Sequence, residues 1–213
     1  MMKNTKEKPS EIIYADFAKS EGLEPKQLEQ FQDYVNILRE WNEKFNLTAI
    51  TSVTGIVKQH FQDSLVLKQF IDLKKVNSIA DIGAGAGFPS IPLKIAFPNL
   101  KIYLIEVNQK KQKFLNFIIN RFNLKDIEII DLDWRTLLRK TNFEIDYFVT
   151  KAALREVELI RMFKPSCHYK NSKLVYWVNQ DWVAYPKAQE YILQENVYRL
   201  GKKERKLVFM GIK

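Results

Sequence analysis

Three glycines at alternate positions are the feature of this sequence with the clearest chemical meaning. Gly83, Gly85 and Gly87 directly follow the short apolar segment Ser78–Ile82. Such a spacing allows a tight turn whose backbone can approach a ligand closely. If the apolar segment is a strand, the turn lies at its carboxyl end, where open α/β sheets bind ligands. The spacing therefore predicts a cofactor site on this loop, to which we assign Gly83, Ala84, Gly85, Gly87 and Phe88.

Two acidic residues indicate which cofactor this loop binds. Dinucleotide folds use G-x-G-x-x-G, whereas this loop reads G-x-G-x-G and has Phe88 at the third glycine position of that pattern. Asp81 lies two residues before the first glycine, where a carboxylate repels a pyrophosphate but suits the cationic amino group of a methionine moiety. Glu106 ends the next apolar run and is expected to accept both ribose hydroxyls, a role that dinucleotide folds share. The pattern favours S-adenosylmethionine over NAD, although Glu106 alone does not discriminate between them.

The elements that position these residues follow an α/β pattern. Helices are expected over 10–19, 25–46 and 53–71, where apolar residues recur at spacings of three and four. Strands are then expected over 78–82, 101–107, 127–132, 145–150, 174–178, 197–200 and 206–212, with helices over 88–97, 109–122, 154–163 and 181–196. Repeated strand–helix units imply a parallel sheet with right-handed crossovers.

We therefore predict a Rossmann-like methyltransferase fold of the α/β class. It has a mostly parallel seven-stranded sheet, and the last two strands form an antiparallel hairpin because only a short turn joins them. Residues 1–75 form an N-terminal helical extension, and residues 76–213 form the cofactor-binding domain.

The charge distribution points to a polyanionic partner. The net charge is +9, from 34 basic and 25 acidic residues. Residues 1–75 carry 11 of each, so residues 76–213 carry 34 − 11 = 23 basic against 25 − 11 = 14 acidic residues. A basic domain of this kind attracts nucleic acid, although solvated surface lysines give the same composition.

Cysteine and hydropathy patterns indicate a cytoplasmic protein. Cys167 is the only cysteine, so neither an internal disulfide nor a multi-cysteine metal site is expected, which fits a reducing compartment. The first ten residues are polar and lysine-rich, unlike a signal peptide, and no apolar run is long enough to cross a membrane. Because the two histidines lie in no Cys/His cluster, we expect no metal site.

Three segments of the chain resemble one known family. They are Trp41–Ile50 (W-N-E-K-F-N-L-T-A-I), Lys58–Leu65 (K-Q-H-F-Q-D-S-L) and the glycine loop Asp81–Ile91. Together they are similar to signatures of the RsmG family, also called glucose-inhibited division protein B, whose members methylate guanine N7 in the small-subunit ribosomal RNA. The resemblance implies S-adenosylmethionine as the methyl donor. It also implies 16S ribosomal RNA or the small-subunit particle as the partner of a monomeric enzyme.

The resemblance also suggests roles for individual residues. Where the family reads G-R-A-E, this chain has Leu132-Asp133-Trp134-Arg135, so we assign Leu132 and Asp133 to the cofactor and Arg135 to RNA. Lys151 occupies the arginine position of the family's S-R-A motif, and we assign it to catalysis and RNA binding. Lysine keeps the positive charge of the arginine but loses its bidentate fork. Two further assignments are Arg155 to RNA binding and His60 to the catalytic pocket.

Guanine N7 methylation makes modest chemical demands. N7 carries a free lone pair, so the transfer needs orientation and exclusion of water, not a general base.

Two alternative functions remain open at this point. One is a methyltransferase acting on another RNA or a small molecule, and the other is an RNA-binding ribosome assembly factor without transfer activity.

Overall fold

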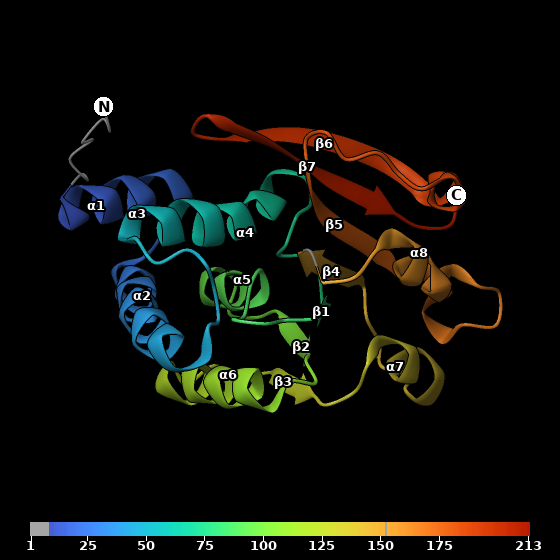
Figure 1. Ribbon diagram of the computed structural model, residues 1–213, viewed down its shortest axis with the longest axis horizontal. Helices are drawn as coiled ribbons and strands as arrows, with labels where there is room; N and C mark the ends of the chain where they lie inside the picture. Colours follow the sequence, from blue (N-terminus) through green and yellow to red (C-terminus); the bar gives the residue numbers. More distant parts are fainter. Residues whose placement is uncertain (1–8, 152) are drawn as a thin grey trace.

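A seven-stranded sheet separates two layers of helices (Figure 1). The structure is a computed structural model that describes residues 9–151 and 153–213. The strands are β1 (Ser78–Ile82), β2 (Lys101–Ile105), β3 (Ile127–Ile130), β4 (Tyr147–Lys151), β5 (Lys173–Asn179), β6 (Ile192–Leu200) and β7 (Lys203–Met210).

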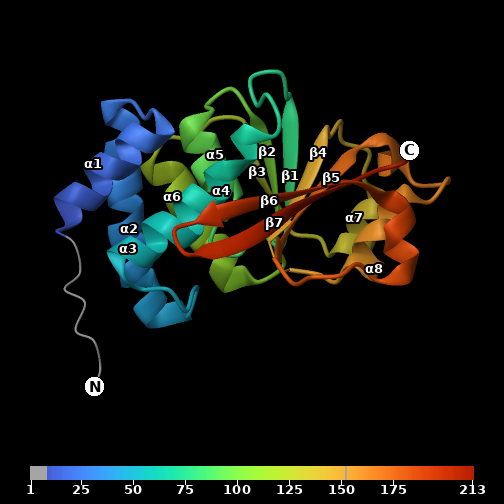
Figure 2. The same ribbon diagram turned by 90° about the horizontal axis from the view of Figure 1, so that it is seen from above.

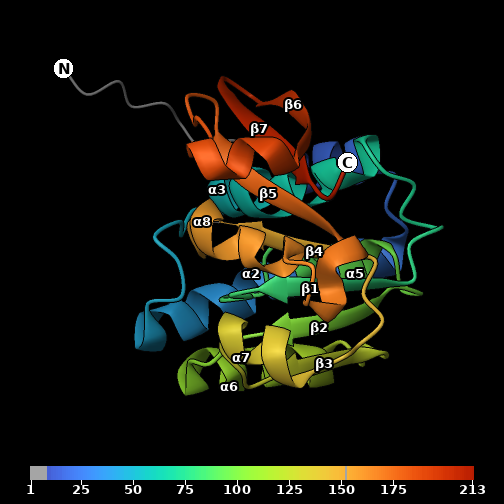
Figure 3. The ribbon, with the colours of Figure 1, turned by 90° about the vertical axis from the view of Figure 1, so that its right-hand side faces the viewer.

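The strand order is β3-β2-β1-β4-β5-β7-β6, which can be followed from bottom to top in Figure 3. The first five strands are parallel, β7 runs antiparallel to β5, and β6 and β7 form an antiparallel hairpin. Every residue of the central strand β1 is buried, as expected for a parallel strand that helices cover on both faces. The predicted sheet of seven strands, mostly parallel with a C-terminal hairpin, is confirmed.

The N-terminal helices lie on one side of the sheet (Figure 2). Helix α1 spans Ser10–Glu21, and α2 spans Pro25–Phe45 with its proline in the first turn, where a missing N–H costs nothing. Helix α2 ends at Asn46, which adopts the left-handed conformation that commonly stops helices. Its buried face consists of Phe31, Tyr34, Val35 and Leu38.

The expected helix over 53–71 is instead a succession of four helical segments. Helix α3 (Val53–Ile56) leads into a π-helix, η1 (Val57–Gln62), then α4 (Asp63–Leu65) and a 3₁₀ turn, η2 (Val66–Gln69). π-helical turns inside helices frequently occur at functional sites. This one carries His60.

Helices α5 (Ser90–Ala96) and α6 (Gln109–Arg121) lie on the same side as the N-terminal helices. On the other side lie α7 (Trp134–Lys140), α8 (Glu156–Leu159) and the 3₁₀ turns η3 (Ile160–Phe163), η4 (His168–Asn171) and η5 (Pro186–Tyr191). Helix α7 was not expected from the sequence. The Asp133 side chain starts it by accepting the Thr136 backbone N–H at 3.0 Å.

Each face of the sheet has its own apolar core. One core joins the N-terminal helices, α5 and α6 to the sheet, and the other lies under α7 and α8. The aromatic side chains Phe17, Phe31, Tyr34 and Phe61 contact one another in the first core. The division of the chain near residue 75 stays a prediction.

The helix expected over 181–196 is wrong. Residues Pro186–Tyr191 form a single short 3₁₀ helix, and Ile192–Leu200 form β6. Pro186 cannot continue a helix from residues before it. The following residues form the edge strand because β7 offers them a ladder of backbone hydrogen bonds from Ile192 to Leu200.

Candidate functional site

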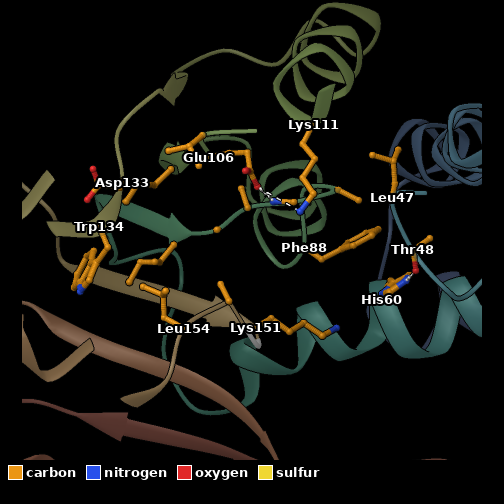
Figure 4. A pocket seen from close by; sticks show the side chains of 18 of the residues that line it. Leu47, Thr48, His60, Phe88, Glu106, Lys111, Asp133, Trp134, Lys151 and Leu154 are labelled. Atoms are coloured by element: carbon orange, nitrogen blue, oxygen red, sulfur yellow. Dashed lines mark hydrogen bonds and ion pairs between the residues drawn. The ribbon is translucent and has the colours of Figure 1, made fainter. Parts of the chain in front are cut away.

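A cavity of about 640 Å³ opens at the carboxyl ends of β1, β2 and β4 (Figure 4). Of the residues assigned from the sequence, those that line it are His60, Gly83, Ala84, Gly85, Phe88, Glu106, Leu132, Asp133 and Lys151. Further lining residues are Leu47, Thr48, Lys111, Trp134, Leu154 and Arg205. The cavity therefore brings together the glycine loop, two strand-end residues and the loop that follows α2.

The glycine loop forms the floor of this cavity. The backbone N–H groups of Gly83 and Ala84 donate to the Ile105 carbonyl at 2.9 and 3.2 Å, which fixes the loop to β2. Gly83, Gly85 and Gly87 all have positive φ, between 61° and 85°, a region that favours glycine. A Cβ on Gly83 would lie 2.4 Å from the Ala153 Cβ, whereas one on Gly85 would meet only a carbonyl at 3.7 Å. The Gly85 backbone therefore faces open space within the cavity.

Asp81 lies beneath this loop and is fully buried. One carboxylate oxygen accepts the Ser90 backbone N–H at 3.3 Å, and the other, Oδ1, has no hydrogen-bond partner within the described ranges, although the Ser90 hydroxyl lies near enough to lower the pKa of this carboxyl. Burial raises the pKa of Asp81 to about 7, chiefly because the charged form loses its hydration. A buried acceptor without a donor is rare and calls for an explanation. A cationic ligand group at Oδ1 supplies one.

Glu106 connects the glycine loop to the end of β2. Its carboxylate accepts the backbone N–H of Gly85 and that of Asn108, each at 2.9 Å, and only 7% of the residue is exposed. The Lys111 ammonium lies 4.0 Å from the same carboxylate. An ionised carboxylate has about four lone-pair sites, so Glu106 still has capacity for two hydroxyl donors from a ligand.

His60 forms the opposite wall, on the π-helix. Its ring stacks on Phe88 at 4.3 Å between centroids, and its Nε2 lies 2.8 Å from the Thr48 hydroxyl. Burial, reinforced by the nearby charges of Lys151 and Arg205, lowers the pKa of His60 to about 3. The imidazole is therefore neutral near pH 7, and its Nδ1 is buried without a partner.

Lys151 belongs to a buried charge cluster between the N-terminal helices and the C-terminal hairpin. Its ammonium forms an ion pair with the fully buried Asp63 and donates to the Gln59 carbonyl at 2.9 Å. Arg205 also pairs with Asp63, at 3.1 Å, and the Tyr198 hydroxyl donates to the same carboxylate at 2.6 Å. Desolvation lowers the pKa of Lys151 and Asp63 opposes this shift. Two cations share one anion, so the cluster brings net positive charge to the cavity wall.

The remaining assigned residues lie differently. Asp133 lines the cavity, but its carboxylate also accepts the Thr136 hydroxyl at 2.6 Å. The carboxylate is therefore already used in capping α7. Gly87, Asp81, Arg135 and Arg155 are not among the residues that line the cavity. Arg135 points to Glu158, with 2.9 Å between its Nε and the carboxylate.

Within residues 9–151 and 153–213, no group of three or more His, Cys, Asp or Glu side chains is arranged to hold a metal ion. In the same part of the chain, no helix has the length and hydropathy needed to cross a membrane.

Comparison with known proteins identifies the family. Residues 27–206 match the model of the GidB family, described as rRNA small subunit methyltransferase G. The chain belongs to this family. Proteins named ribosomal RNA small subunit methyltransferase G include one from Bacillus pumilus, 53% identical over 49% of this chain and 44% of its own length. Another, from Lachnoclostridium phytofermentans, is 41% identical over 67% of this chain and 60% of its own length. The matched region thus spans about half the length of these curated relatives.

Solved structures support the fold. A precorrin-6y C5,15-methyltransferase from Geobacter metallireducens superposes with a TM-score of 0.55 at 16% identity, over 71% of this chain and 88% of that one. TrmN from Thermus thermophilus gives a TM-score of 0.54 at 12% identity, over 82% and 53% of the two chains. These likenesses establish a Rossmann-like methyltransferase fold for this GidB-family chain.

Sequence reasoning missed several residues of the GidB-family site. Arg205 was not singled out, because it lies in the charged run Lys202–Lys206, whose members are usually solvated. Tyr198 gave less signal, because only the fold brings β6 against the helix that carries Asp63. Leu47 and Thr48 lie in a motif that resembled the family, but nothing in their types predicted that they face the glycine loop.

Proposed function

We propose that this chain is an S-adenosylmethionine-dependent methyltransferase that acts on guanine N7 in 16S ribosomal RNA. Membership of the GidB family and the names of its relatives support the reaction class and the substrate. The observation that carries the proposal is the buried, unpartnered oxygen of Asp81 beneath the glycine loop, with Glu106 at the neighbouring strand end.

The residues that line the cavity, together with the buried Asp81 beneath its floor, fit this cofactor. Asp81 presents a buried acceptor to the cationic amino group, and Glu106 retains two lone-pair sites for the ribose hydroxyls. Gly85 leaves the space that the ligand needs, because it carries no side chain and faces the open cavity. Leu132 and Trp134 supply apolar surface for the adenine ring. When bound, S-adenosylmethionine supplies a methyl group on a positively charged sulfur.

The acceptor side fits a base that needs no deprotonation. Guanine N7 is a hydrogen-bond acceptor with a free lone pair. His60 is the only histidine in the cavity, and its pKa of about 3 leaves it neutral but poorly basic at pH 7. We therefore assign His60 to shaping the pocket, through its stack on Phe88, and not to proton transfer. The catalytic contribution is orientation of N7 and exclusion of water.

Lys151 and Arg205 form the wall that we assign to the RNA backbone. An ammonium has three N–H donors, and Lys151 commits two of them to Asp63 and to the Gln59 carbonyl. One donor remains for a phosphate of the target nucleotide. Arg205 adds a guanidinium that pairs with Asp63 through one terminal nitrogen and retains further donors. Asp63 is shared between Lys151 and Arg205, so one positive charge of the cluster is not neutralised. A phosphate of the RNA would supply the second anion.

The proposed partner is 16S ribosomal RNA, free or within the small-subunit particle, and the proposed setting is a monomer in the cytoplasm. The excess of basic residues in 76–213 supports the nucleic-acid partner.

Methyl transfer to defined substrates tests the proposal. Purified protein is incubated with labelled S-adenosylmethionine and either small subunits or naked 16S RNA, both from cells that lack the gene. Mass mapping of nuclease digests should locate a single new 7-methylguanine. Label in another base, or in no RNA at all while the cofactor still binds, would refute the assigned reaction. The second result would favour a non-catalytic assembly factor.

A further inference from the structure

A second, basic cleft lies on the opposite helical layer from the N-terminal helices. It has a volume of about 520 Å³ and lies between α7 and the η3 turn with the loop that follows it. Figure 3 shows α7 on the side facing the viewer. Four cationic side chains line it: Arg135 and Arg139 from α7, Arg161 from η3, and Lys164 after η3. The chain's only cysteine, Cys167, also lines this cleft.

The cations of this cleft exceed the acids that neutralise them. Glu158 accepts from the Nε of Arg135 at 2.9 Å and from the Nε of Arg161 at 2.8 Å. One carboxylate thus orients two guanidinium groups and neutralises one charge. Within the described ranges, neither Arg139 nor Lys164 forms an ion pair with an acid, and Arg139 is only near enough to Asp133 to lower the pKa of that carboxyl. The cleft therefore keeps an excess of positive charge.

We propose that this basic cleft binds backbone phosphates of the RNA substrate beside the target nucleotide. The inference rests on the proposed function, because it takes ribosomal RNA as the partner. Guanidinium groups match phosphates through paired N–H donors. Arg135 and Arg161 are held in place by Glu158 and each keeps further N–H groups for a ligand. The cleft combines two guanidinium groups held in place by Glu158 with Lys164, which has no ion-pair partner in the described ranges. An RNA strand with several phosphates suits this combination better than a single small anion does.

One residue connects the basic cleft to the cofactor cavity. The Trp134 side chain lines the cavity, and its indole N–H donates to the Glu158 carbonyl at 2.9 Å. The Glu158 carboxylate in turn orients Arg135 and Arg161 at the cleft. Trp134 and Glu158 thus link the two sites, and we take an RNA strand with one nucleotide in the cavity to continue onto the cleft.

Charge reversal in the cleft tests the inference in the full chain. The test variant carries Arg139→Glu and Lys164→Glu, which have no ion pair to break. The matched control carries Lys26→Glu and Lys125→Glu, two exposed lysines near α2 and β3 that receive the same change of net charge. We expect the test variant to lose at least tenfold in affinity for a 16S RNA fragment, and the control to lose much less. The dependence of log affinity on log salt should flatten by about 0.7 to 0.9 per lost phosphate contact.

Cys167 reports occupancy of the cleft directly. Saturating RNA fragment should slow alkylation of this thiol by iodoacetamide several-fold in the wild-type protein and in the control, and not in the test variant. Equal S-adenosylmethionine affinity in all three proteins shows that the fold is retained, and Arg139→Gln with Lys164→Gln replaces the test variant if it does not fold.

Four outcomes would be decisive. Equal RNA affinity in the test and control variants, or no protection of Cys167 by bound RNA, would overturn the inference while leaving the proposed reaction standing. Protection by an acidic protein and not by RNA would overturn it as well. Loss of methylation in the wild type, with Cys167 still protected by RNA, would instead count against the proposed function alone.

Discussion

Replacing Asp63 by asparagine removes the only anion of a buried charge cluster and keeps the side-chain shape. Lys151 and Arg205 both pair with this carboxylate, which is fully buried, while their own side chains are 12% and 22% exposed. Breaking a buried ion pair by removing one partner costs about 3–5 kcal/mol, because the remaining charge is left without compensation. The partial exposure of both cations lets water hydrate them, so we expect the lower half of this range.

The expected loss is large enough to measure with certainty. In a protein of this size, 1 kcal/mol changes Tm by about 2–4 °C, so Asp63→Asn should lower Tm by about 6–16 °C. Thermal unfolding followed by tryptophan fluorescence is the assay, since the Trp177 indole donates to the Asp63 carbonyl at 2.9 Å and reports on this region. RNA-dependent turnover should fall as well, because Lys151 and Arg205 lose the group that positions them.

A surface pair provides the control. Asp72 and Lys75 form an ion pair at 3.7 Å, with side chains 54% and 85% exposed, and such pairs contribute at most about 1 kcal/mol. Asp72→Asn should therefore change stability little. Adding Lys151→Met to Asp63→Asn should recover part of the loss, because one uncompensated buried charge is gone. If Asp63→Asn is no less stable than Asp72→Asn, the cluster does not hold the two cations and the reasoning is wrong.

Three further predictions concern the cavity. Gly85→Ala, whose Cβ enters open space, should fold with a loss of about 1–2 kcal/mol from its positive φ and weaken S-adenosylmethionine binding at least tenfold by calorimetry. Gly87→Ala, whose Cβ would lie 2.5 Å from Ile91, should instead show its main loss in thermal stability. The pKa of Asp81 is about 7, so this carboxyl is ionised above pH 7 and protonated below it. Cofactor affinity measured by calorimetry should be constant above pH 7 and should fall about tenfold per pH unit below it. In Asp81→Asn, the cofactor affinity should not depend on pH. The pKa of His60 is about 3 in the folded state, below its unfolded value, so protonation of His60 favours the unfolded state. The urea midpoint should therefore decrease as the pH is lowered from 6.5 to 3, and it should decrease less in His60→Gln.

The sequence predicted the parts of the fold that depend on local pattern. Strand β1 was expected at its observed bounds because an unbroken apolar run followed by glycines has few other interpretations. The first half of strand β6, residues 192–196, was mistaken for part of a helix, since a half-exposed edge strand lacks strict alternation and only its pairing with β7 decides its structure. Helix α7 was missed because it is short and depends on Asp133, which had been assigned to the cofactor.

In the candidate site too, the features that depend on local sequence pattern were predictable and the long-range contacts were not. The proximity of the glycine loop and Glu106 was predictable because both belong to one strand–turn–strand unit, and their roles in cofactor binding stay predictions. Lys151 was expected to present a free charge, but the structure pairs it with Asp63, 88 positions earlier in the sequence. No local pattern encodes that contact, which requires the N-terminal helices to pack beside the end of β4. Arg135 was expected near the cavity and instead faces the basic cleft, because it lies one helical position beyond Trp134 on α7.

Asp63 and Asp81 show how the fold separates the two proposed ligands. Both carboxylates are fully buried, but they differ in the groups that they contact. Asp63 contacts two cations, and its charge is more than neutralised within the protein. Asp81 contacts no cation directly, and one of its oxygens has no partner. A ligand cation therefore gains most at Asp81, and a ligand anion gains most beside Lys151 and Arg205. Under the proposed function, that arrangement would direct a sulfonium-bearing amino acid to the glycine loop and a nucleotide phosphate to the wall that carries Lys151 and Arg205, so that the cavity between them would hold the target base.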